Sequence, residues 1–400
     1  MKIGIIREGK TPHDDRTPLT PAHCVQLIRR GFDVIVQPNP LRCFSDDEYL
    51  QAGIKVQEDI SDREILLGVK EVPIDLLIPG KIYFFFSHTI KKQPHNRKLL
   101  KAILQKKITL LDYEVLTNKQ GMRLIAFGVY AGMVGAHNAL YTYGKRTGAF
   151  DLPRMSDIHD YEKAKELYTR LKLPSLRIVL TGTGRVSGGS VQVLQDMGIR
   201  RVSPEEYLSQ TFDEAVFTQI DSDHYVDKND DSPHDRADFH AHPEQYHSIF
   251  APYLSRTDIL INGIYWDSRA PQFFTLDEMK NPEFKIQVIA DVTCDIAPAS
   301  SIPSTIRAST IADPIYGFDP QTGLEADAFR PDAIDIMAID NLPNEMARDA
   351  SMGFGDQFML SIEPELEHFH DSDIIRRGTI VSFGKLTQGF AYLQEYVDQQ

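Results

Sequence analysis

Short apolar runs recur along the first third of the chain, and the segments between them have helical spacing. Residues 2–6 predict a buried strand, and residues 32–36, 65–69, 82–86 and 108–111 repeat the pattern. Strands that alternate with helices in this way predict a parallel sheet covered by helices on both faces. The fold class predicted for this part of the chain is therefore α/β.

Two of the predicted helices have distinct local signals. Pro21 to Arg30 is bounded by Thr20, a suitable N-cap, and by Gly31, which ends the helix. Residues 127–143 also have helical spacing but are rich in glycine and alanine. Because small residues let a helix pack closely against another backbone, we interpret this segment as the helix that leaves the first domain.

A second set of apolar runs begins in the middle of the chain. Residues 176–180, 257–262 and 286–291 predict further strands. Residues 221–248 hold many acidic residues and five histidines, which indicates an excursion on the surface. Residues 339–343 predict a strand end that opens a helix over about residues 344–360.

Composition narrows the function classes. The 400 residues are 42% hydrophobic and 25% charged, which is typical of a globular chain of about two domains. The net charge of −14 argues against nucleic acid or an anionic membrane as a partner. The N-terminal apolar run is too short and too soon charged for a signal peptide, and no run reaches the length of a membrane span. We therefore expect a cytoplasmic protein.

A metal site is not predicted. His240 and His242 flank a single residue, a spacing that can hold a metal ion, but no third ligand is recognisable near them. The three cysteines are too few and too scattered for a cysteine-rich site. The two histidines are therefore interpreted as part of a solvated loop.

The clearest chemical signal lies in residues 178–190, where a glycine-rich turn joins an apolar run to a helical pattern. Gly182 suits the tight turn, Gly184 lets a pyrophosphate approach the backbone, and Gly188 lets the helix pack against the sheet. The helix N-terminus offers amide groups to phosphate. An ordinary glycine-rich turn is the alternative, but the strand and helix around it favour a dinucleotide site. The expected cofactor contacts are Gly182, Thr183, Gly184, Arg185, Val186 and Gly188.

The residues after this helix bear on the choice of cofactor. About 20 residues after such a turn, an acidic residue usually binds the adenosine ribose. Here Arg200 and Arg201 occupy the corresponding segment, and arginines suit the 2′-phosphate of NADP. Solvated surface arginines are the alternative, and Glu205 or Glu206 would serve NAD. The sequence thus predicts a hydride-transferring enzyme that uses NADP, or NAD, with Arg201 as a contact.

Residues able to move protons follow three apolar runs of the first domain. Lys70 and Glu71 follow the run at residues 65–69. His88 follows the run at 82–86, and Glu114 follows the run at 108–111. Chemistry in open α/β sheets gathers at the carboxyl ends of the strands, so we expect these side chains to share one edge. A histidine transfers protons near neutral pH, and a neighbouring lysine or carboxylate tunes it.

Two arginines are candidates for binding a substrate carboxylate through paired hydrogen bonds. Arg16 lies in a polar loop after the first strand, and Arg123 follows a turn later in the same domain. A solvated surface charge is the alternative for either residue.

Several separate sequence segments resemble those of one family and occur in the same order along the chain. The chain is similar to the lysine-forming saccharopine dehydrogenases, and most of all to the lysine–ketoglutarate reductase half of the aminoadipic semialdehyde synthases. Glu71, next to Lys70, is closer to the fungal form. The similarity runs through nearly the whole chain, including the histidine-rich segment. The blocks that carry it are residues 56–61, 67–70, 85–91, 111–114, 126–128, 181–184, 242–246, 261–266 and 339–343.

This resemblance implies a reversible reaction in which lysine and 2-oxoglutarate form an imine that NAD(P)H reduces to saccharopine. A related amino-acid or opine dehydrogenase, such as an alanine dehydrogenase, and a non-catalytic nucleotide-binding regulator are the alternatives. The oligomeric state stays open, a homo-oligomer included. The implied roles are an acid–base pair of Lys70 and His88, tuning by Glu71 and Glu114, carboxylate binding by Arg16 and Arg123, and a nicotinamide near Asp340 and Asn341.

The resemblance also implies the architecture of the alanine dehydrogenases, with two Rossmann-like domains. Residues 1–133 and 346–400 would form a substrate and catalytic domain built from both ends of the chain. Residues 134–345 would form the dinucleotide-binding domain, with an active-site cleft between the two.

Overall fold

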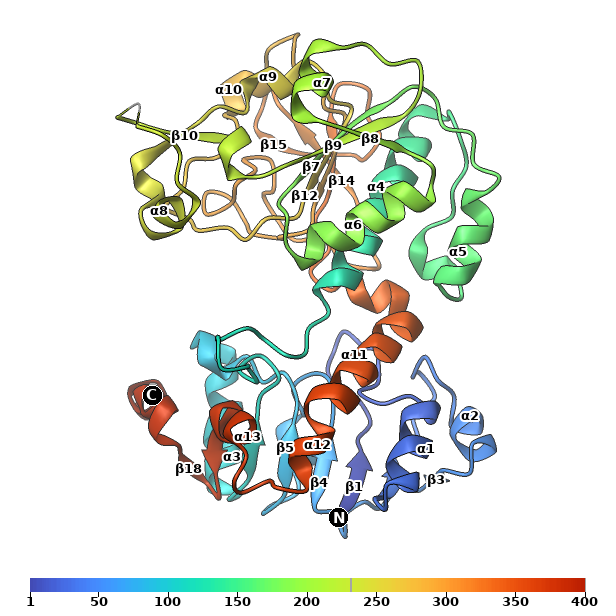
Figure 1. The fold of residues 1–400 in the computed structure, drawn as a ribbon, viewed down its shortest axis with the longest axis vertical. Helices are drawn as coiled ribbons and strands as arrows, with labels where there is room; N and C mark the ends of the chain where they lie inside the picture. Colours follow the sequence, from blue (N-terminus) through green and yellow to red (C-terminus); the bar gives the residue numbers. More distant parts are fainter. Residues whose placement is uncertain (231, 400) are drawn as a thin grey trace. The chain divides into compact units, whose positions relative to one another are not determined.

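The structure, a computed structural model, describes every residue except 231 and 400. The chain divides into two compact units, which we call the first unit (residues 1–127 and 347–400) and the second unit (residues 128–346). Each unit has its own mainly parallel sheet with helices around it (Figure 1), so the predicted α/β class is confirmed. Among the described residues, no helix combines the length and apolar composition needed to cross a membrane.

The sheet of the first unit has eight strands within the described residues, in the order β18-β17-β6-β5-β4-β1-β2-β3. The strands from β6 to β3 are parallel, as the sequence predicts, whereas β17 and β18 are antiparallel. This hairpin is too short for a recognisable alternation of apolar residues. The strands are β1 (Lys2–Ile5), β2 (Asp33–Val36), β3 (Lys55–Val56), β4 (Ile65–Leu67), β5 (Ile82–Phe84), β6 (Thr109–Leu111), β17 (Thr379–Ser382) and β18 (Lys385–Leu386).

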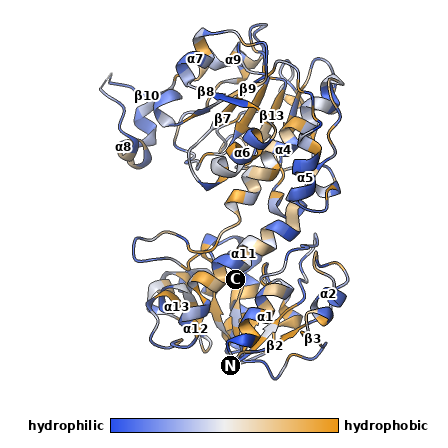
Figure 2. Cartoon of the chain, turned by 45° about the vertical axis from the view of Figure 1, so that its right-hand side comes forward, coloured by the Kyte–Doolittle hydropathy of each residue, from blue (hydrophilic) through white to orange (hydrophobic). Residues whose placement is uncertain are grey.

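Helices cover both faces of this sheet. On one face, Leu27 of α1 and Phe354 and Phe358 of α11 join the apolar side chains of the strands in one cluster. On the other face, Leu100 of α3 and Tyr396 of α14 do the same. In Figure 2 the strands at the centre are coloured as hydrophobic. The helices are α1 (Pro21–Arg29), α2 (Asp46–Gln51), α3 (Arg97–Gln105), α11 (Ala347–Ser361), α12 (Glu363–Leu366), α13 (Asp373–Gly378) and α14 (Gln394–Asp398).

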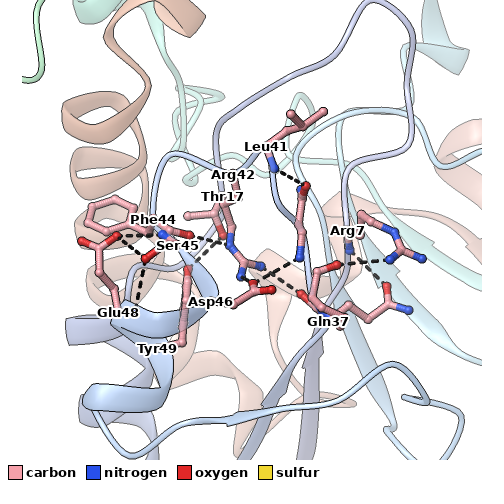
Figure 3. A network of polar contacts seen from close by, with 12 residues as sticks. Arg7, Thr17, Gln37, Leu41, Arg42, Phe44, Ser45, Asp46, Glu48 and Tyr49 are labelled. Carbon is pink, nitrogen blue, oxygen red and sulfur yellow. Dashed lines mark hydrogen bonds and ion pairs between the residues drawn. The ribbon is translucent and has the colours of Figure 1, made fainter.

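A polar network fixes the loop between β1 and α1, which carries Arg16. The guanidinium of Arg42 donates to the carbonyls of Gln37 and Phe44, at 3.1 and 2.9 Å, and lies over the ring of Tyr49 (Figure 3). The Tyr49 hydroxyl in turn donates to the carbonyl of Leu19, at 2.6 Å. Tyr49 of α2 therefore holds the end of the β1–α1 loop in place.

The sheet of the second unit also has eight strands within the described range, in the order β15-β14-β16-β13-β12-β7-β9-β8. The strands from β16 to β8 are parallel, and β14 and β15 add an antiparallel edge that the sequence did not predict. The strands are β7 (Arg177–Thr181), β8 (Arg200–Val202), β9 (Val216–Ile220), β12 (Ile259–Asn262), β13 (Val288–Asp291), β14 (Tyr316–Asp319), β15 (Leu324–Ala326) and β16 (Ile334–Met337).

Residues 221–248 are more than the surface excursion expected from their composition. They contain the hairpin of β10 and β11, and Tyr225, Phe239 and Tyr246 are buried in an apolar cluster on one face of the sheet. Because acidic residues dominate the composition of this segment, the few aromatic residues that are buried could not be recognised from the sequence. The remaining elements of the second unit are α4 (Gly128–Thr147), α5 (Tyr161–Tyr168), α6 (Arg185–Asp196), α7 (Pro204–Ser209), β10 (Val226–Lys228), α8 (Arg236–Ala241), β11 (Tyr246–Ser248), α9 (Ala251–Leu254) and α10 (Leu276–Met279).

Glycines let α4 and α6 touch backbone to backbone, so the close packing predicted for the glycine-rich helix is confirmed. A Cβ atom on Gly132 would lie 1.7 Å from the carbonyl oxygen of Val186, and one on Gly189 would lie 2.0 Å from that of Val129. The prediction that Gly188 provides the close approach is wrong, because a Cβ atom there would meet no atom within 4 Å. The close contact is made instead by Gly189, the next residue of the helix.

Gly189→Ala should therefore destabilise the protein, and Gly188→Ala in the same helix is its matched control. We expect the first to lower the free energy of unfolding by about 1–3 kcal/mol, because overpacking forces the two helices apart. The second should raise it slightly, by up to about 1 kcal/mol, since alanine is the better helix former. Urea unfolding measures both, and equal effects of the two changes would contradict this account of the contact.

Candidate functional site

The parallel register of the first unit brings the carboxyl ends of four strands to one edge of the sheet. Ile5 of β1 pairs with Leu67 of β4, which pairs with Phe84 of β5. Phe84 in turn pairs with Leu111 of β6. The polar residues that follow these four strands are Glu8, Lys70, Glu71, His88 and Glu114.

His88 is held in a fixed orientation at this edge. Its Nδ1 atom lies 2.5 Å from a carboxylate oxygen of Glu71, whose other oxygen accepts from Lys10 at 2.8 Å. Burial alone would raise the pKa of Glu71, but the hydrogen bonds with His88 and Lys10 outweigh it and lower the pKa to about 2. His88 also has a left-handed backbone, with φ of 52°, which residues other than glycine seldom adopt. Such a conformation is typical of functional sites, where the surrounding structure maintains it.

Lys70 lies beside a buried glutamate that the sequence analysis did not single out. The carboxylate of Glu8 accepts from the backbone amides of Val69 and Lys70, at 2.6 and 2.9 Å. Burial, reinforced by the charge of Asp14, raises the pKa of Glu8 to about 8. Burial also lowers the pKa of the Lys70 side chain, and the nearby charge of Arg16 lowers it further. Both shifts favour the neutral form of the group.

Glu114, which follows β6, is paired with two cations. Glu114 accepts from Arg123 at 3.1 Å, and the ammonium of Lys91 lies 3.6 Å from the same oxygen. The other carboxylate oxygen of Glu114 is buried and has no hydrogen-bond partner among the described residues. The side chain of Arg123 is 40% exposed, so it remains accessible to a ligand.

Asp112 joins the loops that follow β5 and β6. Its side chain is fully buried and accepts from the hydroxyl and the backbone amide of Ser87, at 2.5 and 2.9 Å. Its second oxygen accepts from the amide of Glu114, at 2.8 Å. Asp112 therefore fixes the backbone next to His88 and the backbone of Glu114 relative to each other.

Arg16 is buried rather than exposed on the surface. Its guanidinium donates to both carboxylate oxygens of Asp14, at 2.9 and 2.6 Å, and lies 4.1 Å from the ring centre of Phe127. Its charge also lowers the pKa of Lys70, after burial, and opposes the rise in the pKa of Glu8. The surface-charge alternative for Arg16 is therefore excluded.

The glycine turn of the second unit has the shape a pyrophosphate requires. Gly182 has φ of 90°, and a Cβ atom on it would lie 2.9 Å from the carbonyl oxygen of Gly263. Gly184 precedes α6, and a Cβ atom there would enter open space. The first amides of an α-helix have no acceptor within the helix and can bind an anion. The turn therefore fits a dinucleotide, with Thr183, Gly184 and Arg185 exposed at its tip.

A buried polar network lies at the strand end that leads into this turn. The Thr181 hydroxyl donates to Asn262 at 2.7 Å, and the amide of Asn262 donates to Asp291 at 2.9 Å. Asp291 also accepts from Thr305, at 2.6 Å. The network ties together the carboxyl ends of β7, β12 and β13, which are neighbours in the sheet.

The other residues predicted to contact the cofactor are spread along the second unit. Val186 is in the first turn of α6 and is half-buried. Arg201 is exposed on β8, at the edge of the sheet. Asp340 is exposed and Asn341 half-buried in the segment after β16.

Sequence reasoning missed Glu8, Lys10 and Asp112 as members of the site. A signal existed for each, because every one lies within a few residues of an apolar run that the sequence analysis identified as a strand. Their roles depend on contacts across neighbouring strands, such as Glu8 with the amide of Lys70. Such contacts are not visible in the order of residues.

Sequence comparison finds relatives along almost the whole chain. Residues 4–134 match the family described as the N-terminal domain of alanine dehydrogenase/PNT. The α-aminoadipic semialdehyde synthase of Arabidopsis thaliana is 31% identical over 98% of this chain and 41% of that protein. The saccharopine dehydrogenase [NAD(+), L-lysine-forming] of Yarrowia lipolytica is 25% identical over 90% of this chain and 91% of that protein. The chain thus spans less than half of the synthase.

Structural comparison identifies the fold. An L-alanine dehydrogenase superposes with a TM-score of 0.66 at 16% identity, covering 99% of both chains. The predicted pair of Rossmann-like units is therefore confirmed.

The buried carboxyl of Glu8 should make stability depend on pH. In the unfolded chain Glu8 loses its proton near pH 4.5, but in the folded chain only near pH 8, so unfolding releases a proton between these values. Stability should therefore fall as pH rises through this window. In Glu8→Gln this fall should be smaller by up to about 5 kcal/mol, because each unit of the shift from 4.5 to about 8 is worth about 1.4 kcal/mol.

Urea unfolding at a series of pH values measures this difference. Glu283→Gln, at an exposed glutamate of the second unit, is the control and should keep the wild-type profile. A parallel pH profile for Glu8→Gln and the wild type would show that Glu8 is ionised in the folded protein.

Proposed function

We propose that this chain, a homologue of the α-aminoadipic semialdehyde synthases and the fungal saccharopine dehydrogenases, is an oxidoreductase that makes and cleaves saccharopine. Lysine and 2-oxoglutarate are the substrates in the reducing direction. The first unit is the substrate and catalytic domain, and the second binds NAD(P). One observation carries the proposal: a lysine of lowered pKa and a histidine fixed by a carboxylate lie at one sheet edge, among cations suited to carboxylates.

The chemistry has two parts. Condensation of the amine of lysine with the keto group of 2-oxoglutarate gives a carbinolamine and then, with loss of water, an imine. The dinucleotide, when bound, supplies the hydride that reduces this imine. The turn from Gly182 to Gly188, with Thr183, Arg185 and Val186, would hold the pyrophosphate, and Asp340 and Asn341 would lie near the nicotinamide.

The condensation requires proton transfers that Lys70 and His88 perform. Since its pKa is lowered, Lys70 is neutral in a larger fraction of molecules and takes a proton from the attacking amine. His88 gives a proton to the keto oxygen, regains one from solvent, and then protonates the hydroxyl group that leaves as water. Glu71 keeps the imidazole oriented and stabilises its protonated form. In the reverse direction the same groups exchange protons in the opposite order.

The cations of the site bind the carboxylates of the substrates. Saccharopine has three carboxylates, and Arg123 and Arg16 are the proposed partners. Arg123 is accessible and keeps Glu114 beside it, so a substrate carboxylate would share the guanidinium with Glu114. We propose further that the enzyme acts in the cytoplasm, which cell fractionation tests.

His88→Ala should lower turnover by about 10²–10⁴-fold, because it removes the proposed proton donor. The measurement is oxidation of reduced dinucleotide in the presence of lysine and 2-oxoglutarate, with lysine omitted as the blank. His95→Ala, at an exposed histidine of the same unit, should retain wild-type activity.

Wild-type turnover that does not depend on lysine would reject the substrate assignment. Turnover with ammonia and pyruvate instead would identify an alanine dehydrogenase. Cofactor binding with no turnover on any amine and oxo acid would identify a non-catalytic regulator.

Arg123→Met should weaken substrate binding more than it slows chemistry. Loss of a charge-assisted hydrogen bond costs about 1.5–3 kcal/mol, so KM for 2-oxoglutarate should rise by about 10–100-fold with a smaller change in kcat. Lys119→Ala, at an exposed cation of the same loop, is the control. An unchanged KM in Arg123→Met would remove this arginine from the substrate site.

A further inference from the structure

The strand order of the second unit places an unexpected residue next to the glycine turn. β7, which leads into the turn, pairs in parallel with β9, and Thr181 is the partner of Ile220. β8 follows α6 in the chain, yet it pairs with β9 alone and lies at the edge of the sheet. On this side of β7, the neighbouring strand is therefore β9, the third of these strands in chain order, and not β8, the second.

This order changes which side chain can meet the adenosine ribose. In dinucleotide-binding sheets of the usual order, the acidic residue that binds the ribose ends the strand next to the first strand. Here that strand is β9, and the residue that follows it is Asp221. Arg201, in contrast, is separated from β7 by the whole of β9. The expectation that Arg201 meets a 2′-phosphate rested on its distance along the sequence.

Direct contacts join Asp221 to the turn. The amide of Gly182 donates to the carbonyl of Ile220 at 2.8 Å, and the hydroxyl of Thr183 donates to the carboxylate of Asp221 at 3.1 Å. Asp221 also accepts from Arg236, at 2.9 Å. Its side chain is still 26% exposed, so a carboxylate oxygen can reach a ligand bound at the turn.

The surroundings of Asp221 favour a ribose that carries no phosphate. The carboxylate is an acceptor for ribose hydroxyls, and it would repel the double negative charge of a 2′-phosphate. Arg236 forms an ion pair with Asp221 at 2.9 Å, so part of its charge is already neutralised. In Figure 2, β8 is coloured as hydrophilic, in keeping with two arginines exposed on an edge strand.

Next to Arg236 there is also space for a ligand. A cavity of about 470 Å³ is lined by Arg236 and by aromatic residues that include Tyr225, Tyr265 and Trp266. Tyr265 and Trp266 belong to the segment that follows β12, the other neighbour of β7. Aromatic side chains of this kind suit the stacking of a purine ring.

Given the proposed function, we propose that Asp221 binds the adenosine ribose hydroxyls and that the enzyme prefers NAD(H) to NADP(H). This assignment names the cofactor of the dinucleotide site. It replaces the expectation, drawn from Arg201, that the cofactor is NADP.

Binding of ADP-ribose and of its 2′-phosphorylated form, measured by calorimetry, tests the assignment without substrate or turnover. The wild type should bind ADP-ribose at least about 10-fold more tightly. Asp221→Ser should lose about 10-fold of that affinity and bring the two ligands close to equal. Arg201→Ala is the matched control and should leave both affinities within about two-fold of wild type.

The proposal would be overturned if the wild type preferred the phosphorylated ligand and Arg201→Ala abolished that preference. It would also be overturned if the wild type bound neither ligand. The wild-type ratio is decisive even if Asp221→Ser does not fold. In that case Asp221→Asn, which keeps the shape of the side chain, replaces it. Saccharopine formation with a preference for NADPH would reject this assignment alone, whereas preference for ADP-ribose without saccharopine formation would reject the substrate proposal alone.

Discussion

The parallel register of β1, β4, β5 and β6 is the constraint on which the candidate catalytic site depends. Since Ile5, Leu67, Phe84 and Leu111 lie side by side, the segments after them must emerge together. Their side chains come from positions up to about a hundred residues apart in the chain. The buried strands hold this alignment through the apolar clusters on both faces of the sheet. A shift in this register would move the candidate proton-transferring groups apart, although none of these residues would itself be altered.

Electrostatics at this edge follows from the same alignment. Lys70 and Glu8 are both driven towards their neutral forms by burial, whereas Glu71 is held ionised by the two groups that hydrogen-bond to it. Neighbouring groups with pKa values shifted in opposite directions can separate the roles of acid and base. In the second unit, burial also raises the pKa of Asp291, whose hydrogen bonds hold three strand ends under the glycine turn. In the proposed function, the first unit would supply proton transfer and the second unit would bind the dinucleotide.

Much of this could be predicted from the sequence, and the failures have physical causes. Most of the parallel strands and α1 were predicted because their apolar periods are local, and the positions of Lys70 and His88 were predicted because both directly follow such strands. The parallel strands β3, β9 and β16 were not predicted. The antiparallel edges, the buried aromatic residues of 221–248 and the position of Asp221 were missed. Each depends on pairing between distant segments: only strand order shows that β9, rather than β8, lies beside β7. The shift of the helix contact from Gly188 to Gly189 is a difference of about one third of a turn, which a spacing argument cannot resolve.

The central claim is that this chain forms an imine between lysine and 2-oxoglutarate and reduces it with a hydride from a nicotinamide dinucleotide. Mass analysis of the product made with reduced dinucleotide deuterated on its nicotinamide ring tests it most directly. The account predicts saccharopine that carries one deuterium, formed only when lysine, 2-oxoglutarate and the dinucleotide are all present. Saccharopine without deuterium, or a deuterated product that contains no lysine, would contradict it.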